Sequence, residues 1–119
     1  MKRSVIILVA LLTLMIGSTA CADSKAFAYN WYLWRDCPQE VKENYVTGMM
    51  LLESLVGSRD MAKYIKDKAD ARDLVETVDI LYSRPQNREV EIFDAIIAAI
   101  GIRMTGISNE VLKENINKQ

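Results

Sequence analysis

Acid–base, nucleophilic and metal chemistry each need particular side chains, and this chain offers a narrow choice of them. It has 16 acidic residues and two cysteines but no histidine. The absence of histidine removes the usual general base, the base that most often activates a cysteine thiol, and the commonest zinc ligand. The acidic residues at 67–79 lack the Asp-x-Asp-x-Asp-Gly spacing of a calcium loop and alternate with basic residues, as on a solvated helix face. We therefore expect a protein that is not an enzyme and holds no cofactor or metal ion.

The segment 82–88, Tyr-Ser-Arg-Pro-Gln-Asn-Arg, is the best candidate for a contact with another protein. Pro85 can end one helix and stiffen the connection, and Asn87 can cap the next helix. This leaves Tyr82, Arg84 and Arg88 at an exposed corner, and tyrosine and arginine dominate many protein interfaces. The alternative interpretation is structural, with Tyr82 packed inward and the arginines paired with neighbouring glutamates.

A group of aromatic side chains near the start of the expected mature chain is open to the same two interpretations. The group consists of Tyr29, Trp31, Tyr32 and Trp34. Their rings can form a platform for a sugar or a partner protein, because they combine a large apolar area with a polar edge. They can equally seal one helix against a bundle.

The N-terminal residues have the three-part pattern of a bacterial secretory signal. Lys2 and Arg3 are followed by an almost unbroken apolar run at 5–16 and by small residues at 17–22. A helix made from the apolar run would be ~18 Å long at ~1.5 Å per residue, which is too short for a hydrocarbon layer of ~30 Å. The pattern predicts export, which makes the mature protein periplasmic or secreted.

Two processing sites remain open. Ala20-Cys21-Ala22 supplies small residues where signal peptidase reads them, so cleavage before Asp23 gives a signal peptide of residues 1–22 and a helical domain of residues 23–119. The stretch before Cys21 also fits a permissive lipobox, in which case the signal is 1–20 and Cys21 is lipidated in an outer-membrane lipoprotein. Cys37 is either a small buried residue or a thiol that pairs with another chain.

The expected mature part has the length of one domain and a helical pattern nearly throughout. Removing Lys2 and Arg3 from the 15 basic residues leaves 13 against 16 acidic ones, so no nucleic-acid-binding surface is expected. Five glycines and two prolines argue against a sheet with many tight turns. The sequence predicts an all-α fold, a small single-domain bundle of about five helices after the signal peptide.

Apolar spacing and capping residues place these helices. A short aromatic helix is expected within 26–36, followed by helices at 38–56 and 59–68, one that starts after Asp70 and ends by Pro85, one at 89–104, and one after Ser108. Val56 and Val111 are among the residues expected to face inward. The helix at 89–104, capped by Asn87, is apolar almost all round, which predicts that it is the central helix of the bundle.

Two stretches resemble a pattern in small secreted bacterial proteins of unknown function. They are Y-V-T-G at 45–48 and L-Y-S-x-P-x-N-R-x-V at 81–90, and the likeness covers about 41–100. The layout is also similar to that of the Rap/Tai immunity proteins of type VI secretion, which are small exported helical proteins that usually carry a cysteine pair. The first resemblance implies an exported helical domain and the second an immunity function, and neither implies a catalytic residue.

Together these observations favour an exported small helical protein that binds another protein of the envelope or periplasm, with an immunity or inhibitor role included. One alternative is an outer-membrane lipoprotein with a structural or envelope-assembly role, which requires modification of Cys21. Another is an enzyme that uses carboxylates alone, such as a glycan hydrolase. Contact with a membrane is expected only through a lipid on Cys21.

Overall fold

Residues 29–118, which the computed structural model describes, form six α-helices and one 3-10 turn, with no strand among them. The helices are α2 (Trp31–Trp34), α3 (Gln39–Val56), α4 (Arg59–Asp67), α5 (Ala71–Tyr82), α6 (Ile92–Met104) and α7 (Asn109–Asn117), and the turn η2 (Pro85–Asn87) lies between α5 and α6. The predicted all-α fold class is confirmed. The predicted signal peptide and the processing sites at Cys21 and Asp23 lie outside the described residues.

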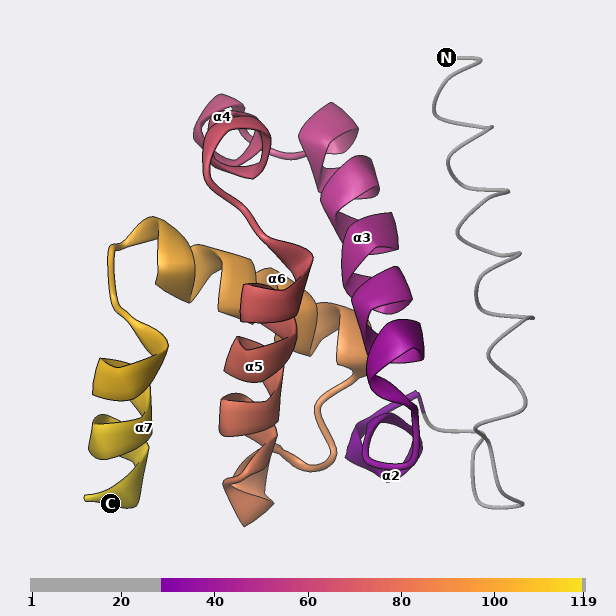
Figure 1. Cartoon of the computed structure of the whole chain (residues 1–119), viewed down its shortest axis with the longest axis vertical. Coiled ribbons are helices and arrows are strands. Elements are labelled where there is room, and N and C mark those ends of the chain that lie inside the picture. The colour runs from indigo at the N-terminus through magenta and orange to yellow at the C-terminus, as the bar shows by residue number, and fades with distance from the viewer. Residues whose placement is uncertain (1–28, 119) are drawn as a thin grey trace.

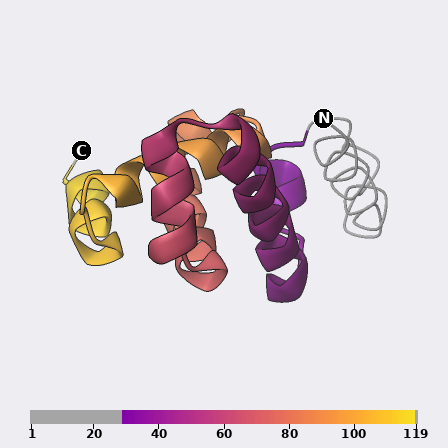
Figure 2. The same ribbon diagram turned by 90° about the horizontal axis from the view of Figure 1, so that it is seen from above.

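Helix α6 crosses the other long helices on one side of the molecule. Figure 1 shows α3, α5 and α7 standing side by side with α6 running behind them, and Figure 2 shows α6 along one edge of the same group. Helix α5 packs against α3, α6 and α7 and so holds the middle of the arrangement. The short helix α2 lies at the end of α3 opposite α4 (Figure 1).

Helix α6 supplies much of the core, as its apolar sequence predicts, but the prediction that it is the central helix is wrong, because it lies along one side (Figure 2) and α5 holds the middle. Ile92, Ala95, Ile96, Ala99 and Ile100 of α6 are all buried. They meet buried side chains from the other elements, which include Trp34, Tyr45, Leu74 and Val78. The side chain of Cys37 is also buried, in agreement with one of the two interpretations of this residue.

Three of the six described helices, α4, α5 and α7, begin where the sequence places a cap. The side chains of Ser58, Asp70 and Ser108 accept hydrogen bonds from the backbone N–H three residues ahead, at 3.1, 3.0 and 3.2 Å. Each bond satisfies one of the donors that a helix leaves open at its first turn. Gly57 follows the last residue of α3, as predicted.

The start of α6 differs from the prediction. Asn87 does not cap a helix that starts at residue 89; it lies in η2, and its side-chain amide donates to the carbonyl of Leu81 at 2.8 Å. The α-helix begins instead at Ile92, with Glu91 in the N-cap position. The last carbonyls of α5 lack helical partners, so they compete with the next helix for the Asn87 side chain.

The short aromatic helix lies inside the predicted range, at Trp31–Trp34, and the Asn30 side chain caps its start by accepting from the backbone N–H of Tyr32 at 3.1 Å. The inward positions expected for Val56 and Val111 are wrong. Val56 is 60% exposed and Val111 is 46% exposed. The buried residues of α3 are confined to its 45–49 stretch, and the only buried residue of α7 is Asn109, so apolar spacing continues in both helices beyond the part that is packed.

Candidate functional site

The aromatic segment and the corner after α5, which are far apart in the sequence, lie side by side. The backbone N–H of Trp31 donates to the carbonyl of Arg88 at 3.3 Å. The backbone N–H of Ile92 donates to the carbonyl of Tyr29 at 2.6 Å. These two main-chain bonds hold the start of α2 between the corner and the first residue of α6, so both predicted groups of contact residues belong to one surface.

The side chain of Tyr82 is buried, so the expectation that it lies exposed at this corner is wrong. Its side chain is 2% exposed, and its hydroxyl donates to the carbonyl of Val90 at 2.6 Å. The ring packs at a tilt against Trp34, with 6.3 Å between the ring centroids. Burial first, and then the negative charges of Asp94 and Glu91, raise the pKa of the phenol above its usual value. The side chain of Tyr82 therefore packs beneath the corner, where it contacts Trp34 and bonds to the backbone of Val90.

The guanidinium of Arg88 lies over an aromatic ring of α2. Its guanidinium carbon is 4.2 Å from the centroid of the Trp31 ring. The guanidinium carbon of Arg35 is 4.8 Å from the same centroid and 5.4 Å from that of Tyr32. Stacking on a ring holds a guanidinium in place while leaving its N–H groups available for hydrogen bonds. Within residues 29–118 the buried Nε of Arg88 has no hydrogen-bond acceptor.

These side chains line a cleft of about 340 Å³ between α2, α3, α5 and the corner. We refer to it as the tryptophan cleft, because its lining includes Trp31 and Trp34, the two tryptophans of the chain. The cationic residues Arg35, Lys42 and Arg88 also line it, together with Asp79. The cleft therefore combines aromatic surface with an excess of positive charge on a protein whose formal net charge is −1.

Asp79 is engaged by other residues of the cleft. One of its oxygens, Oδ1, accepts the indole N–H of Trp34 at 2.7 Å and lies 3.3 Å from the ammonium of Lys42. Lys42 also lies 5.3 Å from the centroid of the Trp34 ring. The charge of Asp79 is thus matched by Lys42, which leaves the guanidinium groups of Arg35 and Arg88 as the excess.

Arg84, the third predicted contact residue, lies away from the tryptophan cleft. It borders a separate depression beside Pro85, Gln86 and Ile116. Of the three predicted contact residues, the structure places Arg88 and the largely buried Tyr82 at the tryptophan cleft and Arg84 outside it. Sequence reasoning missed Arg35, whose position four residues after Trp31 was an available signal, and missed the Lys42–Asp79 pair, for which the sequence carries no signal.

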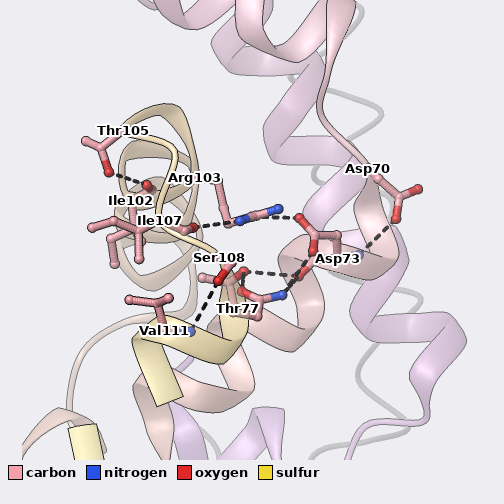
Figure 3. A network of polar contacts seen from close by, with 10 residues as sticks. Asp70, Asp73, Thr77, Ile102, Arg103, Thr105, Ile107, Ser108 and Val111 are labelled. Atoms are coloured by element: carbon pink, nitrogen blue, oxygen red, sulfur yellow. Dashed lines mark hydrogen bonds and ion pairs between the residues drawn. The ribbon is translucent and has the colours of Figure 1, made fainter. Parts of the chain in front are cut away.

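A second group of polar side chains joins α5, α6 and α7, but its members bind one another. Arg103 donates through Nε to Asp73 at 2.8 Å and through Nη1 to the carbonyl of Ile107 at 2.6 Å (Figure 3). The amide of Asn109 donates to the carboxylate of Asp73 at 3.0 Å, and the hydroxyl of Thr77 donates to Asn109 at 2.6 Å. This network attaches α7 to the bundle and leaves little for a ligand.

Comparisons with known proteins give no match from which a function could be inferred, since no protein family, curated protein or solved structure matches the chain. In the part of the chain that the structure describes, no three Cys, Asp or Glu side chains are grouped to hold a metal ion. No single helix there is long and apolar enough to cross a membrane, and only α6 and α7 taken together, with a bend of 112° between them, pass on length and composition.

Proposed function

We propose that the chain is an exported helical domain that binds another protein of the cell envelope or periplasm and acts as an inhibitor or immunity-type factor. The observation that carries the proposal is the stack of Arg88 and Arg35 on Trp31 at the tryptophan cleft. Arginine, tryptophan and tyrosine are the side chains that most often dominate the energetics of protein interfaces.

The surroundings of the cleft support a protein contact. Tyr29, Tyr32 and Val90 are 37%, 44% and 38% exposed and belong to the segments that meet at this surface. Large side chains with an apolar body and a polar edge bury area without leaving a polar group stranded. The main-chain bonds between α2 and the corner hold the surface in one shape, so that little conformational entropy is lost on binding.

A binding role also agrees with the chemistry of the cleft better than glycan hydrolysis does. A glycoside hydrolase needs two carboxylates on opposite sides of the scissile bond. Asp79 is the carboxylate among the described lining residues, and it is hydrogen-bonded to Trp34 and paired with Lys42. The arrangement favours recognition over proton transfer.

The location follows from the N-terminal signal pattern. We infer cleavage before Asp23 and a periplasmic or secreted domain. The lipobox-like stretch before Cys21 favours a second candidate, an outer-membrane lipoprotein with a role in envelope structure or assembly. Both candidates use the same surface for their partner. The resemblance to exported immunity proteins supports the inhibitor role.

Site-specific photo-crosslinking in the native envelope tests the proposal. A photoreactive phenylalanine analogue replaces the exposed Tyr32, which lies beside the cleft against Trp31 and Arg35. In a matched variant it replaces Lys66, which is exposed on α4 at the other end of α3 (Figure 1). Position 32 should crosslink a discrete envelope protein that position 66 does not. Crosslinks that are the same from both positions, or absent from position 32, would refute a partner site at the cleft.

If the captured protein is a toxin or enzyme, the inhibitor role makes a further demand. The purified domain should block the activity of the captured protein, and the Arg88→Ala variant should block it less. Full inhibition by a variant that has lost the stack on Trp31 would place the inhibitory contact elsewhere.

A further inference from the structure

We infer that the tryptophan cleft receives an acidic side chain, so that the partner protein presents a segment rich in aspartate or glutamate. This inference rests on the proposed protein-binding function and specifies the chemistry of the partner. It depends on the position of Arg88 over Trp31, on the charge balance of the cleft and on the finding that no carboxylate of residues 29–118 forms an ion pair with Arg88.

The guanidinium of Arg88 is held on the Trp31 ring, and its buried Nε has no hydrogen-bond acceptor among residues 29–118. The backbone carbonyl of Arg88 accepts from Trp31, and its guanidinium lies 4.2 Å from the centroid of the Trp31 ring. Because Arg88 lines the cleft and its Nε is buried, we infer that the two terminal nitrogens of its guanidinium, Nη1 and Nη2, are the atoms that a ligand in the cleft can reach. A fixed planar guanidinium matches a carboxylate through two parallel hydrogen bonds and loses little side-chain freedom in doing so.

The charge balance of the cleft favours an anion. Lys42 is paired with Asp79, at 3.3 Å, and the pair as a whole contributes no net charge to the cleft. Among the described residues Arg35 pairs with Asp36, at 3.7 Å, and both side chains of that pair are close to half exposed, so solvent screens the interaction. Two arginines that share the Trp31 ring therefore form a local positive site on an acidic protein. Such a site raises the rate of encounter with a negatively charged segment.

The tryptophans allow the inference to be tested without knowledge of the partner. Both line the cleft, so intrinsic fluorescence reports what enters it. The exported protein is titrated with hexaglutamate and, as a matched neutral control, with hexaglutamine. We expect a saturable change with hexaglutamate that weakens as salt is added, and none with hexaglutamine.

Variants locate the binding. Arg88→Gln should weaken the binding of hexaglutamate about tenfold or more, because it removes the charge and the fork. Arg84→Gln, which removes an arginine outside the cleft, should leave the affinity unchanged. Arg35→Gln should also weaken binding, and it keeps the test valid if the melting curve shows that Arg88→Gln does not fold.

Three results would overturn the inference. They are the absence of hexaglutamate binding, equal affinity in wild type and in both cleft variants, and full competition by inorganic phosphate at the same concentration, which would indicate a site for small anions.

Failure of the proposed function gives a different pattern. If hexaglutamate does not bind while position 32 still crosslinks a partner, the protein contact stands and its acidic chemistry is wrong. If hexaglutamate binds while position 32 captures nothing, the cleft prefers carboxylates but the proposed partner site is wrong.

Discussion

Replacing Asn109 by alanine should loosen α7 from the bundle, because this side chain is the buried link between α7 and α5. Asn109 is 8% exposed and Thr77 is fully buried. The change removes the bond from the Thr77 hydroxyl at 2.6 Å and the bonds from the Asn109 amide to the carbonyl and the carboxylate of Asp73, at 3.2 and 3.0 Å. The remaining apolar contacts of α7 come from half-buried side chains, so the network carries much of its attachment.

The magnitude follows from what the stranded groups can still reach. Loss of one partner of a buried polar group costs ~1–3 kcal/mol. The Thr77 hydroxyl can still donate to the carbonyl of Asp73 at 3.0 Å, and Asp73 keeps Arg103 at 2.8 Å, so neither is left without a bond. We therefore expect a loss of about 2 kcal/mol in the free energy of unfolding. Asn109→Asp should cost more, since it places a second carboxylate beside Asp73.

Urea unfolding followed by far-ultraviolet circular dichroism measures the loss, and hydrogen exchange locates it. Amides of α7 (Asn109–Asn117) should lose protection while those of α6 keep it, because α7 opens as a local unit. Asn115→Ala is the matched control, an exposed asparagine on the same helix, and should change stability by less than ~0.5 kcal/mol. Equal unfolding midpoints for the two variants, or retained protection of α7 in Asn109→Ala, would show that the network does not hold the helix.

Three other predictions concern the core, the corner and the N-terminus. Ile96→Asp places a charge where the native side chain is fully buried and should cost at least ~3 kcal/mol in thermal or urea unfolding, so a wild-type melting curve would contradict the burial of this face of α6. Burial raises the pKa of Tyr82, so the folded state holds the phenol proton more tightly than the unfolded chain does. The resulting contribution to the free energy of unfolding is fully present below pH ~10 and declines as the pH rises above that value. Tyr82→Phe should cost about 1 kcal/mol at neutral pH and flatten the alkaline decline in urea midpoints, and an unchanged alkaline slope would refute this account. Mass spectrometry of the exported protein should find Asp23 or a lipid-modified Cys21 at the N-terminus, and an intact Met1 would overturn the secretory signal.

Features that depend on a few neighbouring residues were predictable from the sequence. The caps at Ser58, Asp70 and Ser108 bind amides three residues ahead, so their partners are fixed by local spacing. The extensive burial of α6 follows from its nearly uniform apolar composition, but its place along one side of the bundle does not. Asn87 was not predictable in the same way, because the end of α5 and the start of the next helix both offer it a partner.

Burial at helix ends was less predictable for a related reason. Apolar spacing shows which face of a helix can be buried, but it does not show how far along the helix a neighbour covers that face. Val56 continues the pattern of α3 and is nevertheless 60% exposed, since the buried residues of α3 end at Met49.

The tryptophan cleft depends on pairings between segments that the sequence does not relate. Trp34 and Asp79 are 45 residues apart and Lys42 and Asp79 are 37 apart, and no local spacing predicts either contact. Arg84 and Arg88 flank the same proline turn, and the sequence alone gives no reason to prefer either of them as the residue that contacts a partner. The fold separates them, because the carbonyl of Arg88 accepts from Trp31 and its guanidinium stacks on that ring, while Arg84 borders a different depression. A comparison of the two arginines by single substitution therefore tests the site in a way that replacing both together cannot.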